Sequence, residues 1–286
     1  MNKKILASVL AVLLALGAAW YFWQQTRAVP VTPALAPQVA APIPGTKPPA
    51  PVVEPQPTIR YPLGAMPSPS SLPELGRSDA PFSKALGGWL GHRVLALFFS
   101  DEMIRRIVKT VDNLPRKKLP PDAMPLKPVP GALITTGKGD KLAVSWRNAA
   151  RYAVYLRVMR AIDAGKLVGI YADFYPLFQR AYEELTNSNA YFNDRLVESM
   201  DDMLAAPEPA EPVKLVWVNG LFAFADPELE ARSAGQKILI RTGPANAKAI
   251  KAKLGEIRDK VTRNAAASQG TAAGGSPGNP AGGAVK

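Results

Sequence analysis

The segment DAGKLVGIYADFYPLFQRAYEEL, residues 163–185, decides the fold of this chain. Its large apolar residues recur every three or four positions, which is the period of an amphipathic α-helix. Asp163 precedes the repeat and is a favourable N-cap residue. Pro176 lacks a backbone N–H, so we expect it to kink or restart the helix after Tyr175. The stripe predicted to face the core consists of Leu167, Tyr171, Phe174, Phe178, Tyr182 and Leu185.

The segments on both sides predict a mainly α domain. Capping residues, apolar periodicity and Gly or Pro stops indicate six further helices, of which Asp79 and Ser100 are expected to cap the first two. Two short apolar runs separated by Gly137–Asp140 indicate a small β-hairpin, and one further short strand follows. The expected helices cover 79–86, 100–113, 147–162, 191–205, 226–243 and 244–261; the hairpin pairs 132–136 with 141–145, and the further strand covers 213–218.

An apolar segment at the N-terminus predicts a single transmembrane helix before this domain. Residues 5–23 carry no charge and are long enough to cross a bilayer. Lys3 and Lys4 precede them, so the positive-inside rule places residues 1–4 in the cytoplasm and exports the rest. The aromatic run 20–23 favours an uncleaved anchor over the alternative, a cleaved signal peptide. We therefore expect a single-pass protein of a bacterial inner membrane with its main domain in the periplasm.

Small residues in this segment raise a further hypothesis. Alanines recur every four positions on one face of the expected membrane helix, and such spacing lets two helices approach closely. A homodimer through the membrane helix is the functional interpretation, and chance in an Ala-rich helix is the simpler one. The residues are Ala7, Ala11, Ala15 and Ala19.

Composition divides the rest of the chain into three parts. Residues 24–60 are rich in Pro and Ala, which favours an extended, disordered linker. Residues 264–286 are rich in Gly, Ala and Ser, which predicts a disordered tail. Residues 61–263 contain most of the aromatic residues and nearly all of the acidic ones, so they should form the helical periplasmic domain.

The composition of the 286-residue chain excludes several kinds of chemistry. It has no Cys, which rules out disulfides, Cys nucleophiles and thiolate-bound metal clusters. It has one His, which rules out sites that need two imidazoles. That residue, His92, lies in an apolar stretch, and no serine-hydrolase motif accompanies it. We expect neither a catalytic residue nor a cofactor nor a metal.

Acidic residues cluster on one expected helix. They lie three to four positions apart, so they should share a face. The preferred interpretation is a solvated or ion-paired face, and the alternative is a hydrolase site, since glycoside hydrolysis needs only two carboxylates. The four residues are Asp194, Glu198, Asp201 and Asp202.

Basic residues concentrate around the end of the helix expected at 100–113. Arg105 has an acidic residue four positions before it, and Lys109 follows on the same helix. Arg116, Lys117 and Lys118 come after the helix and lack such local partners. The five residues are a candidate patch for an anionic partner, and a solvated loop is the plainer interpretation.

Aromatic residues suggest one more candidate. Most tyrosines fall between Tyr152 and Tyr191, where a buried stripe is the preferred interpretation. An aromatic cleft for a glycan is the alternative, with Tyr152 and Tyr175 as its exposed members. The segment ILIRTGPANAKAI, residues 238–250, imitates half of a helix-hairpin-helix, but Gly243 is its only hairpin glycine. Nucleic acid is therefore not expected as a partner.

Four segments resemble a known family. They are TVDNLPRKKLP (110–120), FYPLFQRAYEEL (174–185), YFNDRLVESMDDMLAAPEP (191–209) and FADPELEARSAGQKILIRTGPANAKAIKAKL (224–254). They are similar to a proteobacterial family of envelope proteins, domain of unknown function 3014, over roughly Tyr61–Arg258. The resemblance implies a membrane segment, a Pro-rich linker and this domain, and it implies no catalytic residue. The sequence departs from the family pattern at Thr186-Asn187-Ser188, where a Gly-containing turn is expected.

Together these observations favour a non-enzymatic binding or scaffolding module of the cell envelope. The chain has a net charge of +12, and most basic residues lie in the domain. The partners to expect outside the membrane are an envelope protein or peptidoglycan. The alternative function is a carboxylate-dependent hydrolase acting on peptidoglycan.

Overall fold

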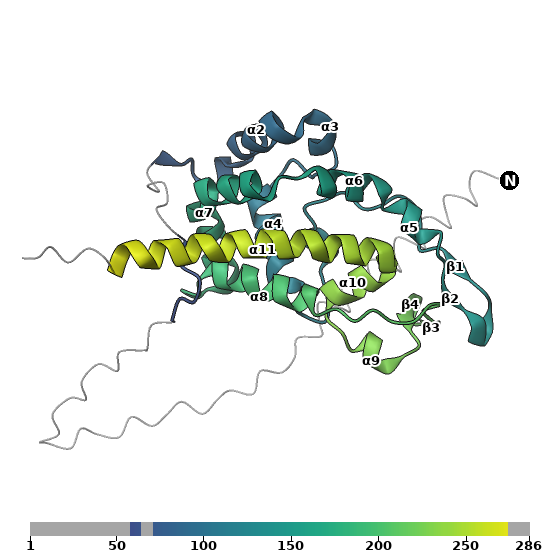
Figure 1. Ribbon diagram of the computed structural model, residues 1–286. Helices are drawn as coiled ribbons and strands as arrows, with labels where there is room; N and C mark the ends of the chain where they lie inside the picture. Colours follow the sequence, from purple (N-terminus) through teal and green to yellow (C-terminus); the bar gives the residue numbers. More distant parts are fainter. Residues whose placement is uncertain (1–57, 64–70, 274–286) are drawn as a thin grey trace, which may run out of the picture. The chain divides into compact units, whose positions relative to one another are not determined.

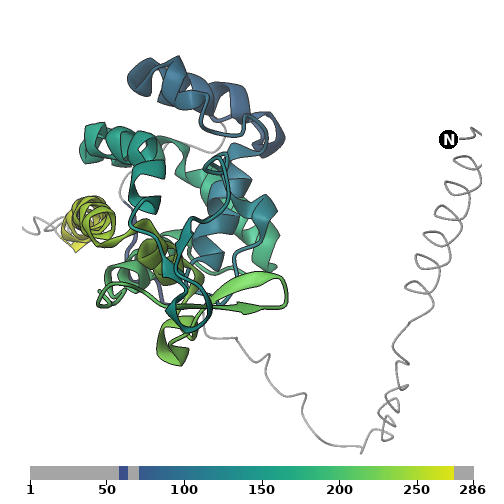
Figure 2. The same ribbon diagram turned by 90° about the vertical axis from the view of Figure 1, so that its right-hand side faces the viewer.

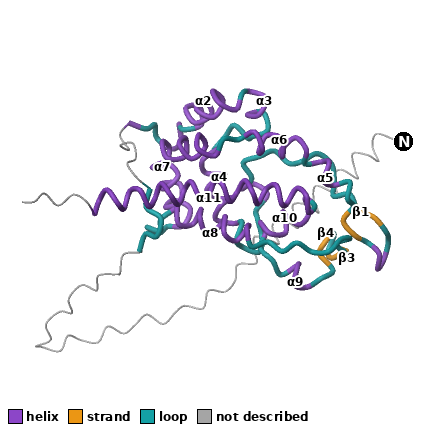
Figure 3. Tube along the Cα trace, viewed as in Figure 1, coloured by secondary structure: helices purple, strands orange, loops and turns teal. Residues whose placement is uncertain are grey.

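The computed structural model describes residues 58–63 and 71–273. These residues fold into ten α-helices and two antiparallel pairs of short strands, which confirms the expected mainly α fold for this part of the chain (Figure 1, Figure 3). None of the described helices is long and apolar enough to span a membrane. The expected tip at 1–4, the span at 5–23 and most of the linker lie outside the described residues.

Most of the helices are short, and only α7 and α11 exceed twenty residues. Among the described residues are also three single turns of 3-10 helix: η2 (Leu75–Arg77) precedes α2, and η3 (Pro121–Ala123) and η4 (Gly139–Lys141) lie between α4 and α5. The strands are β1 (Thr135–Thr136), β2 (Ala143–Val144), β3 (Leu215–Val218) and β4 (Leu221–Phe224). The helices are α2 (Asp79–Leu90), α3 (His92–Leu95), α4 (Met103–Asn113), α5 (Asn148–Arg151), α6 (Ala153–Ala161), α7 (Ala164–Thr186), α8 (Phe192–Leu204), α9 (Pro227–Glu230), α10 (Ala234–Thr242) and α11 (Pro244–Ala273).

Helices α4, α7, α8 and α11 pack together at the centre of the described domain. Helix α4 lies against α7 and α8, and α11 lies against α6, α7, α8 and α10 (Figure 1). The α2–α3 pair lies on the outside and reaches α4 and α7 through α2 (Figure 2). Both strand pairs lie at the end of the domain where α5 begins (Figure 1).

The apolar stripe of α7 forms the main core, as the sequence predicts. Phe178 is buried, stacks on the ring of Phe192 with 5.9 Å between centroids, and meets the ring of Phe82 edge-on at 5.7 Å. The core therefore joins α2, α7 and α8 through aromatic contacts. Leu185, the last residue of the expected stripe, is 40% exposed and lies beyond the core.

Helix α7 begins as expected but does not restart at Pro176. The Asp163 carboxylate accepts a hydrogen bond of 2.8 Å from the backbone N–H of Lys166, and this bond holds the pKa of Asp163 below its usual value. The helix continues through Pro176 to Thr186. Leu177 is buried immediately after the proline, so packing on the bundle offsets the missing backbone hydrogen bond.

The caps of α2 and α4 differ from those expected. Ser78 takes the N-cap position of α2, and α4 begins at Met103, three residues after Ser100. The carboxylate of Asp79 accepts hydrogen bonds of 2.8 Å from the backbone N–H groups of Glu102 and Met103. Asp79 thus caps a helix that starts 24 positions later in the chain, so the prediction of a local cap at Ser100 is wrong.

We expect Asp79→Ala to lower the free energy of unfolding by about 1 kcal/mol, because two N–H groups at the start of α4 lose their acceptor. Urea denaturation followed by circular dichroism measures this change. Asp79→Asn keeps one acceptor oxygen and should lose less stability. An Asp79→Ala midpoint equal to that of the parent would contradict the cap.

Two expected helices are each divided in two. The helix expected at 147–162 breaks at Tyr152 into α5 and α6, and the one expected at 226–243 becomes α9 and α10. Asp226 caps α9 as predicted, by accepting from the N–H of Glu228 at 2.8 Å. Ser233 provides a second cap for α10 by accepting from the N–H of Gln236 at 3.1 Å. Helix α11 continues to Ala273, past its expected end near Val261.

The two strand pairs include one strand that the sequence analysis missed. The expected hairpin forms with Thr135 opposite Val144 and Thr136 opposite Ala143. The expected strand at 213–218 becomes β3, but it pairs with β4, where no strand was predicted. Asn219 and Gly220 connect the two and both have positive φ, as a two-residue type I′ turn requires. This Asn-Gly pair is the sequence signal that would have predicted β4.

Candidate functional site

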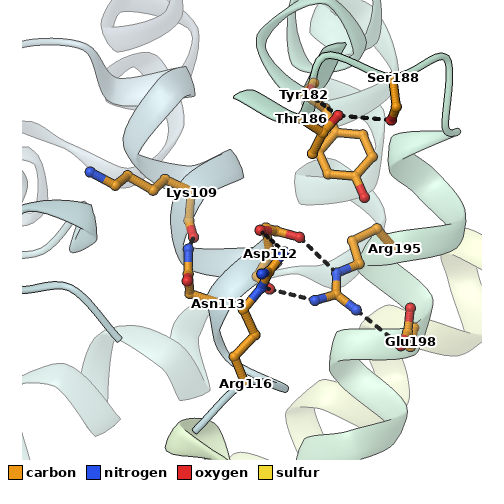
Figure 4. A network of polar contacts seen from close by, with 9 residues as sticks. All are labelled: Lys109, Asp112, Asn113, Arg116, Tyr182, Thr186, Ser188, Arg195 and Glu198. Atoms are coloured by element: carbon orange, nitrogen blue, oxygen red, sulfur yellow. Dashed lines mark hydrogen bonds and ion pairs between the residues drawn. The ribbon is translucent and has the colours of Figure 1, made fainter. Parts of the chain in front are cut away.

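A buried carboxylate connects α4 to α8. Asp112, on α4, is 4% exposed, and its Oδ1 accepts a hydrogen bond of 3.0 Å from Nε of Arg195 on α8 (Figure 4). Its Oδ2 accepts from Nη2 of Arg116 at 2.7 Å, and Arg195 also contacts Glu198 at 2.9 Å. The two arginines and the two carboxylates have no net charge together, and each group has an ionic partner within the network.

The electrostatics of this network are those of a structural ion pair. Burial lowers the pKa of Arg195, but Glu198 and Asp112 outweigh that effect and the pKa of Arg195 ends above its usual value. The neighbouring Tyr182 has a raised pKa because of its burial and the negative charge of Asp112. Both shifts move these pKa values further from neutral pH, so Arg195 is charged and Tyr182 is neutral there. The network is therefore built to hold α4 on α8.

The predicted basic patch is largely neutralised. Arg116 pairs with Asp112, four positions earlier, so the prediction that Arg116 lacks a local partner is wrong. Arg105 pairs with Glu184, Lys109 pairs with Asp122, and the ammonium of Lys117 donates to the carbonyl of Ala231. Lys118 is exposed and has no partner in the part of the chain that the structure describes.

The four acidic residues on α8 do not converge on one site. The carboxylate of Asp194 accepts from the N–H groups of Arg60 at 2.9 Å and Tyr61 at 2.8 Å. Asp201 pairs with Arg258 of α11, and Asp202 accepts from the hydroxyl of Ser233 at 2.6 Å. With Glu198 on Arg195, each carboxylate contacts a different partner. These contacts attach α8 to its surroundings and fit the preferred interpretation of an ion-paired face.

Only one of the two tyrosines proposed for an aromatic cleft is accessible. Tyr175 is 1% exposed, its hydroxyl donates to Gln179 at 2.9 Å, and burial raises its pKa far above the usual value. The prediction that Tyr175 is exposed is wrong, because the turn of α7 at Pro176 faces the core. Tyr152 is half-buried between α5 and α6.

Four large exposed apolar residues lie on the β3–β4 hairpin. Trp217 is 61% exposed and packs edge-on against Phe222 across the hairpin, with 4.6 Å between ring centroids. Leu221, at the turn, is 73% exposed. The residues from Leu215 to Ala225 include no charged side chain. We call four of them the hairpin surface: Val216, Val218 and Leu221, which share one face of the hairpin, and Trp217, which shares the other face with Phe222.

A second exposed tryptophan lies at the foot of this hairpin. Trp146 is 76% exposed, follows β2, and shares a cleft with Val213, just before β3. The N–H of Val144 donates to the carbonyl of Val213 at 2.9 Å, which fixes β2 beside the hairpin. Solvent-exposed apolar residues grouped in this way mark interaction sites. The sequence analysis did not single out these residues.

Comparison with models of protein families assigns the chain to a family. The model of a family described as protein of unknown function, DUF3014, matches residues 103–258. The chain belongs to this family. The match confirms the resemblance and ends at Arg258 as expected, but it begins at Met103 and not near Tyr61. No curated protein and no solved structure matches the chain.

The DUF3014 region contains both candidate features described above. It runs from the first residue of α4 into α11, so it holds both sides of the Asp112–Arg195 pair and both strand pairs. Helices α2 and α3 lie before it. Within the described residues, no group of three or more His, Asp or Glu side chains is arranged to hold a metal ion.

Proposed function

We propose that this DUF3014 protein is a non-enzymatic binding module of the cell envelope that docks on another envelope protein. In this proposal the segment 5–23 anchors the chain in the inner membrane, and the Pro-rich linker carries the domain into the periplasm. The hairpin surface is the docking site. The observation that carries the proposal is the exposure of Trp217 and Leu221 on an uncharged hairpin.

The composition of the hairpin surface supports a protein partner. A tryptophan and three aliphatic side chains lose little conformational entropy when they are buried and gain much from leaving water. Tryptophan is the residue type most enriched among the contacts that dominate protein interfaces. A two-stranded hairpin held at its foot by β2 presents these side chains on a defined scaffold.

The charge next to the hairpin surface supports an acidic partner. All charged residues between Lys141 and Ile162 are basic, and this segment includes β2, α5 and α6. Arg147, which follows Trp146 at the foot of the hairpin, is exposed and makes no ion pair within the described residues. Such a field would steer an acidic protein toward the docking site and make the association sensitive to salt.

The contacts of the acidic residues do not support the hydrolase alternative. A general acid and a general base or nucleophile have to face a common substrate. Asp194, Glu198, Asp201 and Asp202 each contact a separate partner, and the aromatic cleft lacks Tyr175. We therefore retain the binding module as the single proposed function.

Site-specific photo-crosslinking in living cells tests this proposal. A photoreactive amino acid at Leu221 of the full-length chain should form an adduct with another protein, whereas the same residue at Leu185, which is also exposed but lies on α7, should not. Trp217→Ser should raise the dissociation constant of the purified complex with the partner identified in this way about 30-fold, which corresponds to about 2 kcal/mol. Leu185→Ser is the matched control and should leave the affinity unchanged.

Two results would contradict this function. Adducts at Leu221 that contain only lipid would make the hairpin surface a membrane contact. A dissociation constant that does not change in Trp217→Ser would exclude the hairpin surface as the docking site. Trp217 is exposed, so loss of folding is not expected to confuse either result.

A further inference from the structure

Two apolar cavities lie side by side in the described domain. The first, which we call the α2 cavity, has a volume of about 200 Å³ and lies between α2, α7 and α11, with walls that include Phe82, Ile170 and Val261. The second, the α6 cavity, has a volume of about 290 Å³ and lies against α6, with walls that include Met159 and Ile250. Phe98 and Ile162 line both, and both open to solvent.

The walls of these cavities select the chemistry of a ligand. The α2 cavity is lined only by Phe, Leu, Ile, Val and one Tyr residue. In the α6 cavity Thr242 and Tyr155 already bond to the backbone carbonyls of Leu239 and Lys127. An apolar cavity of about 150 Å³ stays dry and takes up hydrocarbon. The two volumes together fall in the range of about 300–1,000 Å³ that is usual for ligand sites.

Polar groups at the α6 cavity are suited to an anionic head. The hydroxyl of Tyr152, which lines this cavity, makes no hydrogen bond within the described residues. Arg160 follows the cavity-lining Met159 on α6 and has no acidic partner among the described residues, whereas Arg157 lies on the side of α6 opposite the cavity-lining residues. A chain in the cavity would leave its head group near the Arg160 guanidinium, where charge-assisted hydrogen bonds are strong.

The other charges near the shared wall are already paired. Asp163 follows Ile162, and its carboxylate is bonded to the N–H of Lys166. Lys253 of α11 donates to the carbonyl of Ile162 at 2.9 Å and pairs with Glu256 at 2.6 Å. The unpaired charge beside the α6 cavity is therefore positive.

From this arrangement we infer that the domain binds a lipid acyl chain with an anionic head group. The chain occupies the α6 cavity, passes between Phe98 and Ile162, and ends in the α2 cavity. The head group lies at the solvent-open side of the α6 cavity, within reach of Arg160. A free fatty acid and an anionic phospholipid share this chemistry. The site is separate from the hairpin surface, so it does not depend on the docking function proposed above.

Photoaffinity labelling of the full-length protein tests the inference. Cells that make the protein are supplied with a fatty acid that carries a diazirine near the end of its chain, and are then irradiated. The protein is denatured and digested, and its peptides are analysed by mass spectrometry. We expect lipid adducts on the peptides that contain Phe98 and Ile162. The mass of the adduct distinguishes the free fatty acid from a phospholipid. Labelling of the hairpin peptide alone would place lipid at the surface and overturn the inference.

Variants on α6 provide matched controls. Ile162→Trp fills the passage between the two cavities and should abolish the adducts, whereas Val154→Trp, on the exposed side of the same helix, should keep them. Arg160→Glu changes only an exposed side chain, so the domain should remain folded while labelling falls strongly. Equal labelling in the parent, Ile162→Trp and Arg160→Glu would show that the cavities bind no anionic acyl chain.

Discussion

Replacing Asp112 with alanine is expected to lower the free energy of unfolding by about 3–5 kcal/mol. Asp112 is the buried member of the network between α4 and α8, and its carboxylate receives Arg195 at 3.0 Å and Arg116 at 2.7 Å. Without it, the largely buried guanidinium of Arg195 keeps only Glu198 as an ionic partner. Removing one side of a buried pair leaves a charge without compensation, and that penalty is larger than the net benefit of the pair.

Urea denaturation of the parent and three variants checks this expectation. Asp101→Ala removes an exposed carboxylate that pairs with Arg106, and it should scarcely move the midpoint. Combining Asp112→Ala with Arg195→Met removes both buried charges, so the double variant should regain part of the lost stability. If Asp112→Ala were no less stable than Asp101→Ala, the network would not be what holds α4 on α8.

Phe178→Ala is expected to lower the free energy of unfolding by a similar amount, about 3–5 kcal/mol. The ring of Phe178 lies between Phe82 on α2 and Phe192 on α8, so its removal affects three helices at once. Phe178 also lines the α2 cavity. Truncation would enlarge a space that is already present, and the surrounding side chains cannot close it without moving a helix.

Thermal and urea denaturation separate a packing effect from a surface effect. Phe178→Leu keeps most of the apolar volume and should lose less stability than Phe178→Ala. Leu185→Ala, at the exposed end of the expected stripe, should change the midpoint little. Equal midpoints for Phe178→Ala and Leu185→Ala would contradict the position of Phe178 in the core.

Local sequence signals predict the helices well and their contacts poorly. The stripe on 163–185 predicts the helix and its buried face, and Asp163 and Asp226 cap the helices that follow them. Asp79 has equally good capping chemistry, yet its carboxylate serves α4. Both arrangements satisfy a carboxylate with N–H donors, so the sequence around Asp79 does not distinguish them.

The candidate patches show the same limit. Arg116 and Asp112 are four positions apart, but the chain leaves α4 at Asn113, so helical spacing beyond that point could not be assumed. Tyr175 and Phe178 lie on the same helix, on either side of Pro176. Both side chains are buried in the core, although Tyr175 was proposed as an exposed residue. The exposure of Trp217 could not be predicted either, because a continuous apolar run such as 215–218 indicates a strand without indicating which of its side chains are covered.

The sequence by itself determined that the domain is mainly helical, which face of α7 is buried, and that chemistry requiring Cys or paired His is excluded, because periodicity, capping and composition are local properties. Only the tertiary structure decided that Asp112 meets Arg195, that the acidic residues of α8 contact separate partners, and that Trp217 faces solvent. These features depend on contacts between residues far apart in the chain. Packing selects one such set through the sum of many weak interactions, which no single segment encodes.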